Sequence, residues 1–180
     1  YKIPKIPLDG QKKIVDVLSR AESAVEKRRE AIRLLDDFLK STFLEMFGDP
    51  TNNPKEWPME KVSEFCLTQS GGTPDRNNPD YFDGGVPWIK SGELKNSYVT
   101  RCEETISELG LQNSNAKRLP MDAVLIAMYG ATVGEIGLLK INGATTNQAV
   151  AAVIPEPGRA ASTYLFHLFR HLSKHLILKR

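Results

Sequence analysis

Apolar residues recur along the first quarter of the chain with the spacing of a helix that packs lengthwise against another helix. Steps of four and three residues separate them, which is the 3.5-residue period of a coiled-coil seam, and a second column widens the stripe. The residues of this stripe, which we assign to a subunit interface, are Ile14, Val17, Leu18, Ala21, Val25, Ile32, Leu35, Phe38 and Leu39. The pattern predicts one helix of roughly 58 Å at 1.5 Å per residue.

Signals on both sides delimit this helix. Residues 1–8 contain two prolines and are expected to form an extended arm. Asp9 is suited to the N-cap, and Gly48, followed by a proline two residues later, is typical of a helix end. We therefore expect a spacer helix over 9–48 and a compact domain over 49–180. No second helix of similar length is indicated, so the stripe is expected to pack on another copy, another subunit or a part of the protein outside this sequence.

After the helix, short apolar runs alternate with loops rich in glycine and proline. Residues 123–129 and 149–154 are apolar almost throughout, which predicts buried strands, and 135–141 is a weaker run of the same kind. Asn142-Gly143 is a typical hairpin turn. Together with the helix, these runs predict an α+β protein, in which a long coiled-coil-type helix joins a mixed α/β domain with a glycine-rich, loop-heavy β-sheet.

The remaining segments give weaker signals. Residues 86–90 predict a strand and 98–105 an extended segment. Residues 106–111 suggest a short helix that Gly110 closes. The last element is an amphipathic helix over 162–178, whose apolar face comprises Leu165, Leu168, Phe169, Leu172 and Leu176.

Composition limits the function classes only broadly. Hydrophobic residues make up 41% of the 180 residues, charged residues 26%, and the net charge is +2. No apolar run approaches the ~20 residues of a membrane span, and no basic stripe indicates nucleic-acid binding. Cys66 and Cys102 lie far apart without metal-ligand spacing. We expect them to be reduced thiols in a cytoplasmic protein.

No catalytic or metal site can be argued from the order of the residues. His167, His171 and His175 recur every four residues but have no acidic or thiol ligand nearby, so no metal site is predicted. Residues 78–81 superficially resemble an adenine-methyltransferase motif, yet aspartate replaces its second proline and no cofactor loop precedes it. A free-standing methyltransferase or nuclease is therefore disfavoured.

Short segments spread over nearly the whole chain form a set in a defined order. They are residues 6–8, 11–15, 47–50, 71–74, 87–94, 125–132 with Gly134, and 146–149. Taken jointly, these segments resemble the specificity subunit of type I restriction–modification enzymes. The resemblance implies a non-catalytic reader of double-stranded DNA.

The resemblance also implies an architecture and a set of partners. Two long antiparallel helices hold two target-recognition domains apart, so that each domain reads one half of a bipartite sequence and the helices set the gap. Methyltransferase subunits pack on the helices and use S-adenosylmethionine, and a restriction and translocation subunit uses ATP and Mg²⁺. This chain itself would bind no cofactor, and its helix would pair with a second helix of the same subunit or with another copy.

The sequence departs from that pattern because it contains one helix and one recognition domain. Either it is a fragment, with the central helix and a second recognition domain that is incomplete on its C-terminal side, or it is a half-size subunit that pairs with itself. A different class, a coiled-coil scaffold without a nucleic-acid role, is the alternative hypothesis. The target sequence and the gap length cannot be deduced.

Residue type and loop position select the candidate DNA contacts. They are Thr73, Arg76, Lys90, Ser91, Lys117, Arg118, Tyr129, Thr132, Asn147 and Gln148. Lysine and arginine are expected mainly at phosphates, whereas glutamine, asparagine and arginine can reach base edges. For each of them the alternative is a local role in a turn or in the core. Gly71, Gly72 and Gly130 are expected to shape loops rather than to contact a ligand.

Overall fold

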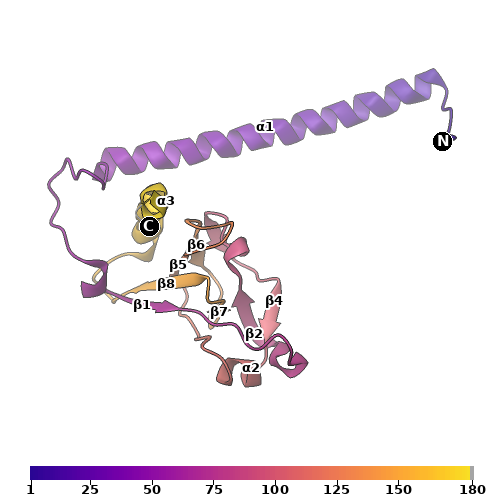
Figure 1. Cartoon of the computed structure of the whole chain (residues 1–180). Helices are drawn as coiled ribbons and strands as arrows, with labels where there is room; N and C mark the ends of the chain where they lie inside the picture. Colours follow the sequence, from indigo (N-terminus) through magenta and orange to yellow (C-terminus); the bar gives the residue numbers. More distant parts are fainter. Residues whose placement is uncertain (179–180) are drawn as a thin grey trace. The chain divides into compact units, whose positions relative to one another are not determined.

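The computed structural model describes the backbone of residues 1–178 and the side chains of residues 1–173. The chain divides into two compact units, Tyr1–Gly48 and Asp49–Arg180. The first contains one long helix, and the second combines two β-sheets with short helices and long loops (Figure 1). The predicted α+β class is therefore confirmed.

The long helix α1 spans Leu8–Phe47, and it begins one residue earlier than the sequence suggests. Pro7 occupies the N-cap and Asp9 lies in the first turn, so the N-cap prediction for Asp9 was wrong. The fixed φ of proline suits the start of a helix, and a carboxylate in the first turn still complements the helix dipole. Gly48 ends the helix as predicted, with φ at 78° and its N–H donating to the carbonyl of Leu44 at 2.8 Å.

The apolar stripe of α1 is exposed. Val17 is 65% exposed, and the other large apolar side chains of the stripe are exposed as well. Ion pairs link charged side chains along the helix, including Arg20 with Asp16 at 2.9 Å. Such exposed pairs contribute only about 0.2–0.5 kcal/mol each to a helix. A long helix with this much exposed apolar surface is expected to gain its main stabilisation from a packing partner.

Two sheets form the second unit. The larger sheet contains, in spatial order, β1 (Cys66–Ser70), β8 (Val150–Pro155), β5 (Val124–Ala127), β6 (Ile136–Leu139) and β3 (Ser97–Val99), all antiparallel except the β6–β3 pair. The smaller sheet contains β4 (Glu104–Ile106), β2 (Phe82–Ile89) and β7 (Thr145–Thr146), with β2 and β7 parallel. The other elements are α2 (Glu108–Gln112), α3 (Ser162–Leu178) and 3₁₀ turns at Val62–Glu64, Pro79–Tyr81 and Ser91–Glu93.

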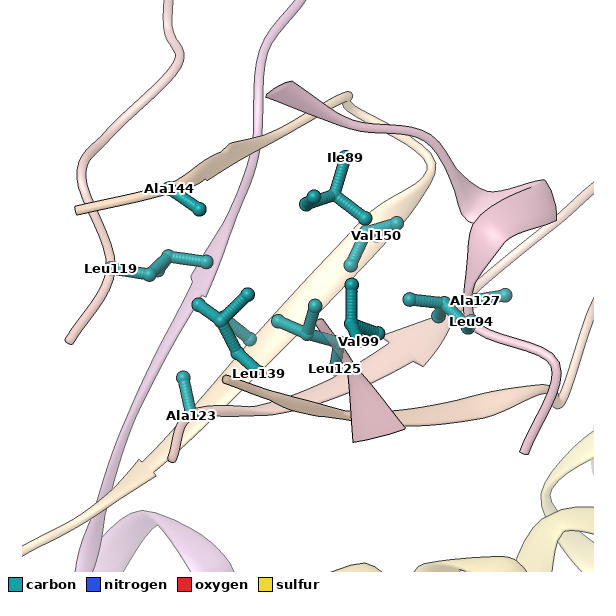
Figure 2. Close-up of a cluster of buried hydrophobic side chains, with 11 residues drawn as sticks. Ile89, Leu94, Val99, Leu119, Ala123, Leu125, Ala127, Leu139, Ala144 and Val150 are labelled. Carbon is teal, nitrogen blue, oxygen red and sulfur yellow. The ribbon is translucent and has the colours of Figure 1, made fainter. Parts of the chain in front are cut away.

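The main core is built on the larger sheet, whose central strands are buried on both faces. On one face, Leu125, Leu139 and Val150 pack with Ile89, which comes from the end of β2 (Figure 2). On the other face, alternate residues such as Val124 pack against α3. Because successive side chains of a strand point to opposite faces, a strand covered on both sides is an unbroken apolar run. This is the pattern that the sequence shows at 123–129 and 149–154.

Helix α3 covers its face of the sheet with Leu165, Phe166 and Phe169, which are all buried. Leu168 packs beside them and Leu172 is half-buried, so the predicted apolar face is largely confirmed. The predicted contact at Leu176 lies outside the described side chains. Phe166 is an addition that the sequence pattern did not identify.

Two turn predictions were wrong. Asn142-Gly143 joins no hairpin, because β6 pairs with β5 and β3, whereas β7 pairs with β2 in the other sheet. Gly143 does take the left-handed conformation expected of such a turn, with φ at 65°, but the turn carries the chain between sheets. Gly110 lies inside α2 rather than at its end. Glycine is needed at this position because a Cβ would come within 2.4 Å of the carbonyl oxygen of Tyr81.

Candidate nucleic-acid interface

Several loops meet at one end of the larger sheet, where β1 and β5 end and β8 begins. The N–H of Gly71 donates to the carbonyl of Val150 at 3.1 Å, and the N–H of Met128 donates to Ala149 at 2.8 Å. The N–H of Asn147 donates to the carbonyl of Ile89, the last residue of β2, at 3.0 Å. These bonds fix a set of loops that we call the loop cluster. It comprises residues 71–76, 90–91, 128–134 and 147–149.

Two glycines allow the first of these loops to approach its neighbours. A Cβ on Gly71 would lie 2.2 Å from the carbonyl oxygen of Thr146 and 2.4 Å from that of Asn147. A Cβ on Gly72 would lie 2.3 Å from the backbone nitrogen of Ala116. Only glycine fits so close to the backbone of another segment. Both residues therefore shape the loop cluster.

Amide and hydroxyl side chains line part of the loop cluster. The hydroxyl of Thr73 donates to the side-chain oxygen of Gln148, across 75 residues of sequence. Asn147 is half-buried, and its side-chain oxygen accepts no hydrogen bond from any of the described residues. Tyr129 is 43% exposed and Thr132 is half-buried in the loop after β5. The structure thus brings these five sequence-predicted residues together in the loop cluster.

A second group of predicted residues is arranged around one carboxylate, and we call it the Arg76 cluster. Glu104 accepts from Nη1 of Arg76 at 2.7 Å and from Nζ of Lys90 at 2.8 Å, and Lys90 also pairs with Glu103 at 3.0 Å. The guanidinium of Arg76 lies over the rings of Phe82 and Trp88, with its central carbon 4.7 Å and 4.8 Å from the two ring centres. The two cations are thus partly neutralised within the domain.

These ion pairs shift the pKa of Glu104 and the pKa of Lys90 in opposite directions. The hydrogen bonds from Lys90 and then from Arg76 hold the pKa of Glu104 below its ordinary range. The hydrogen bonds to Glu104 and then to Glu103 raise the pKa of Lys90. Both shifts favour the charged forms, so Lys90 and Glu104 stay ionised at neutral pH.

Acidification is expected to weaken the fold through Glu104. A carboxyl whose pKa is lower in the folded state contributes stability above its unfolded pKa, about 4.3, and this stability is lost as the pH falls through the lowered value. The free energy of unfolding should therefore fall less steeply between pH 5 and about pH 3 in Glu104→Gln than in the unmodified chain. Denaturant unfolding across that range measures the two slopes, and equal slopes would contradict the assignment.

The other predicted contacts are distributed around the domain. Arg118 donates to the carbonyl of Gly143 at 3.2 Å and pairs with Glu108, so it supports a turn. Lys117 is exposed, whereas Ser91 lies within the loop cluster, where it begins the 3₁₀ turn after β2. The sequence did not identify Glu104, whose role depends on pairing between distant segments.

Within the described residues, no group of three histidine, cysteine or acidic side chains is placed to hold a metal ion. The side chain of His175 lies outside the described set. Cys66 and Cys102 are both free thiols, and burial is the main reason that the pKa of Cys66 is raised. No described helix is both long and apolar enough to cross a membrane.

The chain thus joins a long helix to a β-rich domain that carries the loop cluster, the two parts of which specificity subunits of restriction–modification enzymes are built. Residues 54–179 match the type I restriction modification DNA specificity domain, and the chain belongs to that family. The family supplies specificity rather than catalysis. The predicted resemblance is confirmed by this match.

Two curated relatives illustrate the relationship. The chain is 31% identical over 120 residues to the type I restriction enzyme MjaIX specificity subunit of Methanocaldococcus jannaschii, which covers 65% of this chain and 27% of that protein. It is 25% identical over 178 residues to the EcoR124I/EcoR124II specificity subunit of Escherichia coli, with 88% and 44% covered. The chain thus spans less than half the length of these two relatives.

Solved structures share the fold. The HsdS subunit from Thermoanaerobacter tengcongensis superposes with a TM-score of 0.58 at 18% identity, over 97% of this chain and 44% of that one. A structure from work on assembly and conformational transition of the type I R-M system gives a TM-score of 0.59 at 19% identity, with the same coverage. At these identities, the likeness concerns the fold of the chain.

Proposed function

We propose that residues 49–180 recognise one half of a bipartite DNA target. The observation that carries this proposal is the match to the DNA specificity domain over residues 54–179, the same segment that builds the loop cluster. Amide, hydroxyl and guanidinium groups suited to base edges gather there, on loops held by a rigid sheet. The loop cluster is the part of the domain that we assign to the DNA.

The long helix has a separate role in the proposal. Its exposed apolar stripe packs on a second long helix, from the same subunit or from another copy, and on methyltransferase subunits. The helix pair then acts as a spacer that sets the distance between two recognition domains. S-adenosylmethionine, ATP and Mg²⁺ belong to the methyltransferase and restriction subunits in this proposal, and this chain positions those subunits without binding the cofactors.

The modest charge of the chain fits a shared interface. Most candidate cations pair with carboxylates, whereas Lys117 is exposed and makes no ion pair within the described side chains. Because phosphate contacts dominate the affinity of most DNA-binding proteins, much of the affinity would come from the partner subunits. This domain would mainly supply the choice of sequence.

A chimaera tests the proposal. A complete specificity subunit of known target receives residues 49–180 in place of one of its recognition domains and is expressed with its methyltransferase. Sequencing of methylated bases in the genome should then give a motif in which one half is new and the other half and the gap are unchanged. An unchanged motif from an assembled, active complex would refute the proposal.

A further inference from the structure

We infer that Arg76 reads a guanine through the major groove, with Glu104 as the residue that positions it. This inference rests on the proposed function, and it names one base that the domain recognises and the side chain that contacts this base. Three features of Arg76 support this role: its guanidinium is restrained, several of its N–H donors remain exposed, and carboxylates surround it.

The guanidinium of Arg76 is restrained on two sides. Its central carbon lies over the rings of Phe82 and Trp88, 4.7 Å and 4.8 Å from their centres, and Glu104 accepts a hydrogen bond from Nη1 at 2.7 Å. Trp88 is itself immobile, because it is only 2% exposed and its Nε1 donates to the carbonyl of Gly72 at 3.0 Å. A side chain held in this way loses little conformational freedom when it binds a base.

Arg76 keeps donors available in spite of these contacts. A guanidinium carries five N–H donors, and only one of them is used by Glu104. The side chain is 51% exposed, so the others can face a ligand. Two such donors in a fixed fork match the O6 and N7 acceptors of guanine, which is the commonest specific contact in the major groove.

The surrounding charge favours a base over a phosphate. Arg76 and Lys90 lie beside two carboxylates, Glu103 and Glu104, and the pKa of Glu104 is lowered, so it remains ionised. These carboxylates would repel a phosphate, whereas the edge of guanine is uncharged and presents acceptors. A partly neutralised arginine therefore gives up affinity for the backbone but keeps its hydrogen-bonding pattern.

The position of Arg76 agrees with this role. The guanidinium of Arg76 lies over Trp88, whose Nε1 donates to the carbonyl of Gly72. The residue after Gly72 is Thr73, whose hydroxyl donates to the side-chain oxygen of Gln148. Arg76 is thus continuous with the amide and hydroxyl groups of the loop cluster. A guanine read by Arg76 would be near any base that Gln148 contacts.

The test uses the chimaeric subunit assembled with its methyltransferase, and duplexes that carry its methylated motif. Each guanine of the new half-site is replaced in turn by 7-deazaguanine, which lacks N7, and by inosine, which keeps O6 and N7 but lacks the minor-groove amino group. At one guanine, 7-deazaguanine should weaken binding by roughly 5- to 150-fold, while inosine is tolerated. If no guanine shows this behaviour, the inference is wrong, whatever the variants do.

Variants then assign the contact. Arg76→Lys keeps the positive charge but loses the paired N–H donors of the guanidinium. It should therefore abolish the difference in binding between guanine and 7-deazaguanine at that one position. Glu104→Gln should reduce the same difference in part. Arg101→Lys, an exposed arginine in the same domain, is the matched control and should change nothing. Equal weakening of all duplexes by Arg76→Lys would indicate a phosphate contact and overturn the inference. If the chimaera recognises the new half-site and Arg76→Lys leaves its binding unchanged at every guanine, the inference is refuted but the proposed function is not.

Discussion

Replacing Leu18 or Ile32 with glutamate is expected to abolish assembly of the subunit while residues 50–180 remain folded. Both side chains lie on the exposed stripe of α1. Each would lose about 1.5–3 kcal/mol of apolar burial at an interface, and a buried carboxylate adds a penalty of several kcal/mol. Sedimentation of the variant with its partner subunits should show free components, and circular dichroism should show an intact domain.

Asp37→Lys is the matched control for this prediction. At ~100° per residue, the stripe extends around the helix from Leu18 to Phe38, and Asp37 lies ~100° outside each of these two edges. The charge reversal there should leave assembly almost unchanged. If Asp37→Lys dissociates the complex as strongly as Leu18→Glu, or if neither has an effect, the stripe is not the interface.

Gly71→Ala is expected to destabilise the recognition domain by about 3 kcal/mol or more and to abolish DNA recognition. Its Cβ would lie 2.2 Å from two oxygens of Thr146 and 2.4 Å from the carbonyl oxygen of Asn147. Backbone has to move to relieve such contacts, and overpacking of this kind is among the largest effects of a single substitution. Denaturant unfolding of the chain measures the loss.

Gly85→Ala provides the comparison. A Cβ on Gly85 meets no atom within 4 Å, so the free energy of unfolding should change by no more than ~0.5 kcal/mol. Equal effects of the two substitutions would show that the close approach of Gly71 to its neighbours does not hold the loop cluster together.

The elements that the sequence predicted best are those with a single dominant physical cause. The stripe from Ile14 to Leu39 has a period that only a helix satisfies, and α1 (Leu8–Phe47) contains the whole stripe. The runs at 123–129 and 149–154 are apolar on both faces, which fits the two-sided burial of β5 and β8. In each case, local sequence and tertiary burial require the same structure.

The sequence-based predictions failed where contacts between distant segments determine the structure. The turn at Asn142-Gly143 has the local conformation of a hairpin, but the next strand pairs with β2 rather than with β6. The bond between Arg76 and Glu104 joins segments 28 residues apart. Pairing of β2 with β4 places Glu104 beside Trp88, and Arg76 lies over the Trp88 ring. Residue type and loop position could suggest Arg76, but they could not indicate its carboxylate partner. The DNA contacts themselves stay predictions.

The most direct test of the account is a hydroxyl-radical footprint of the assembled complex, made with a specificity subunit that carries residues 49–180 in one recognition position. The account predicts two protected segments separated by a fixed gap. Exchange of residues 49–180 for another recognition domain should change the protected sequence of one segment only. Protection that is the same with either domain would contradict the claim that this domain selects the DNA sequence.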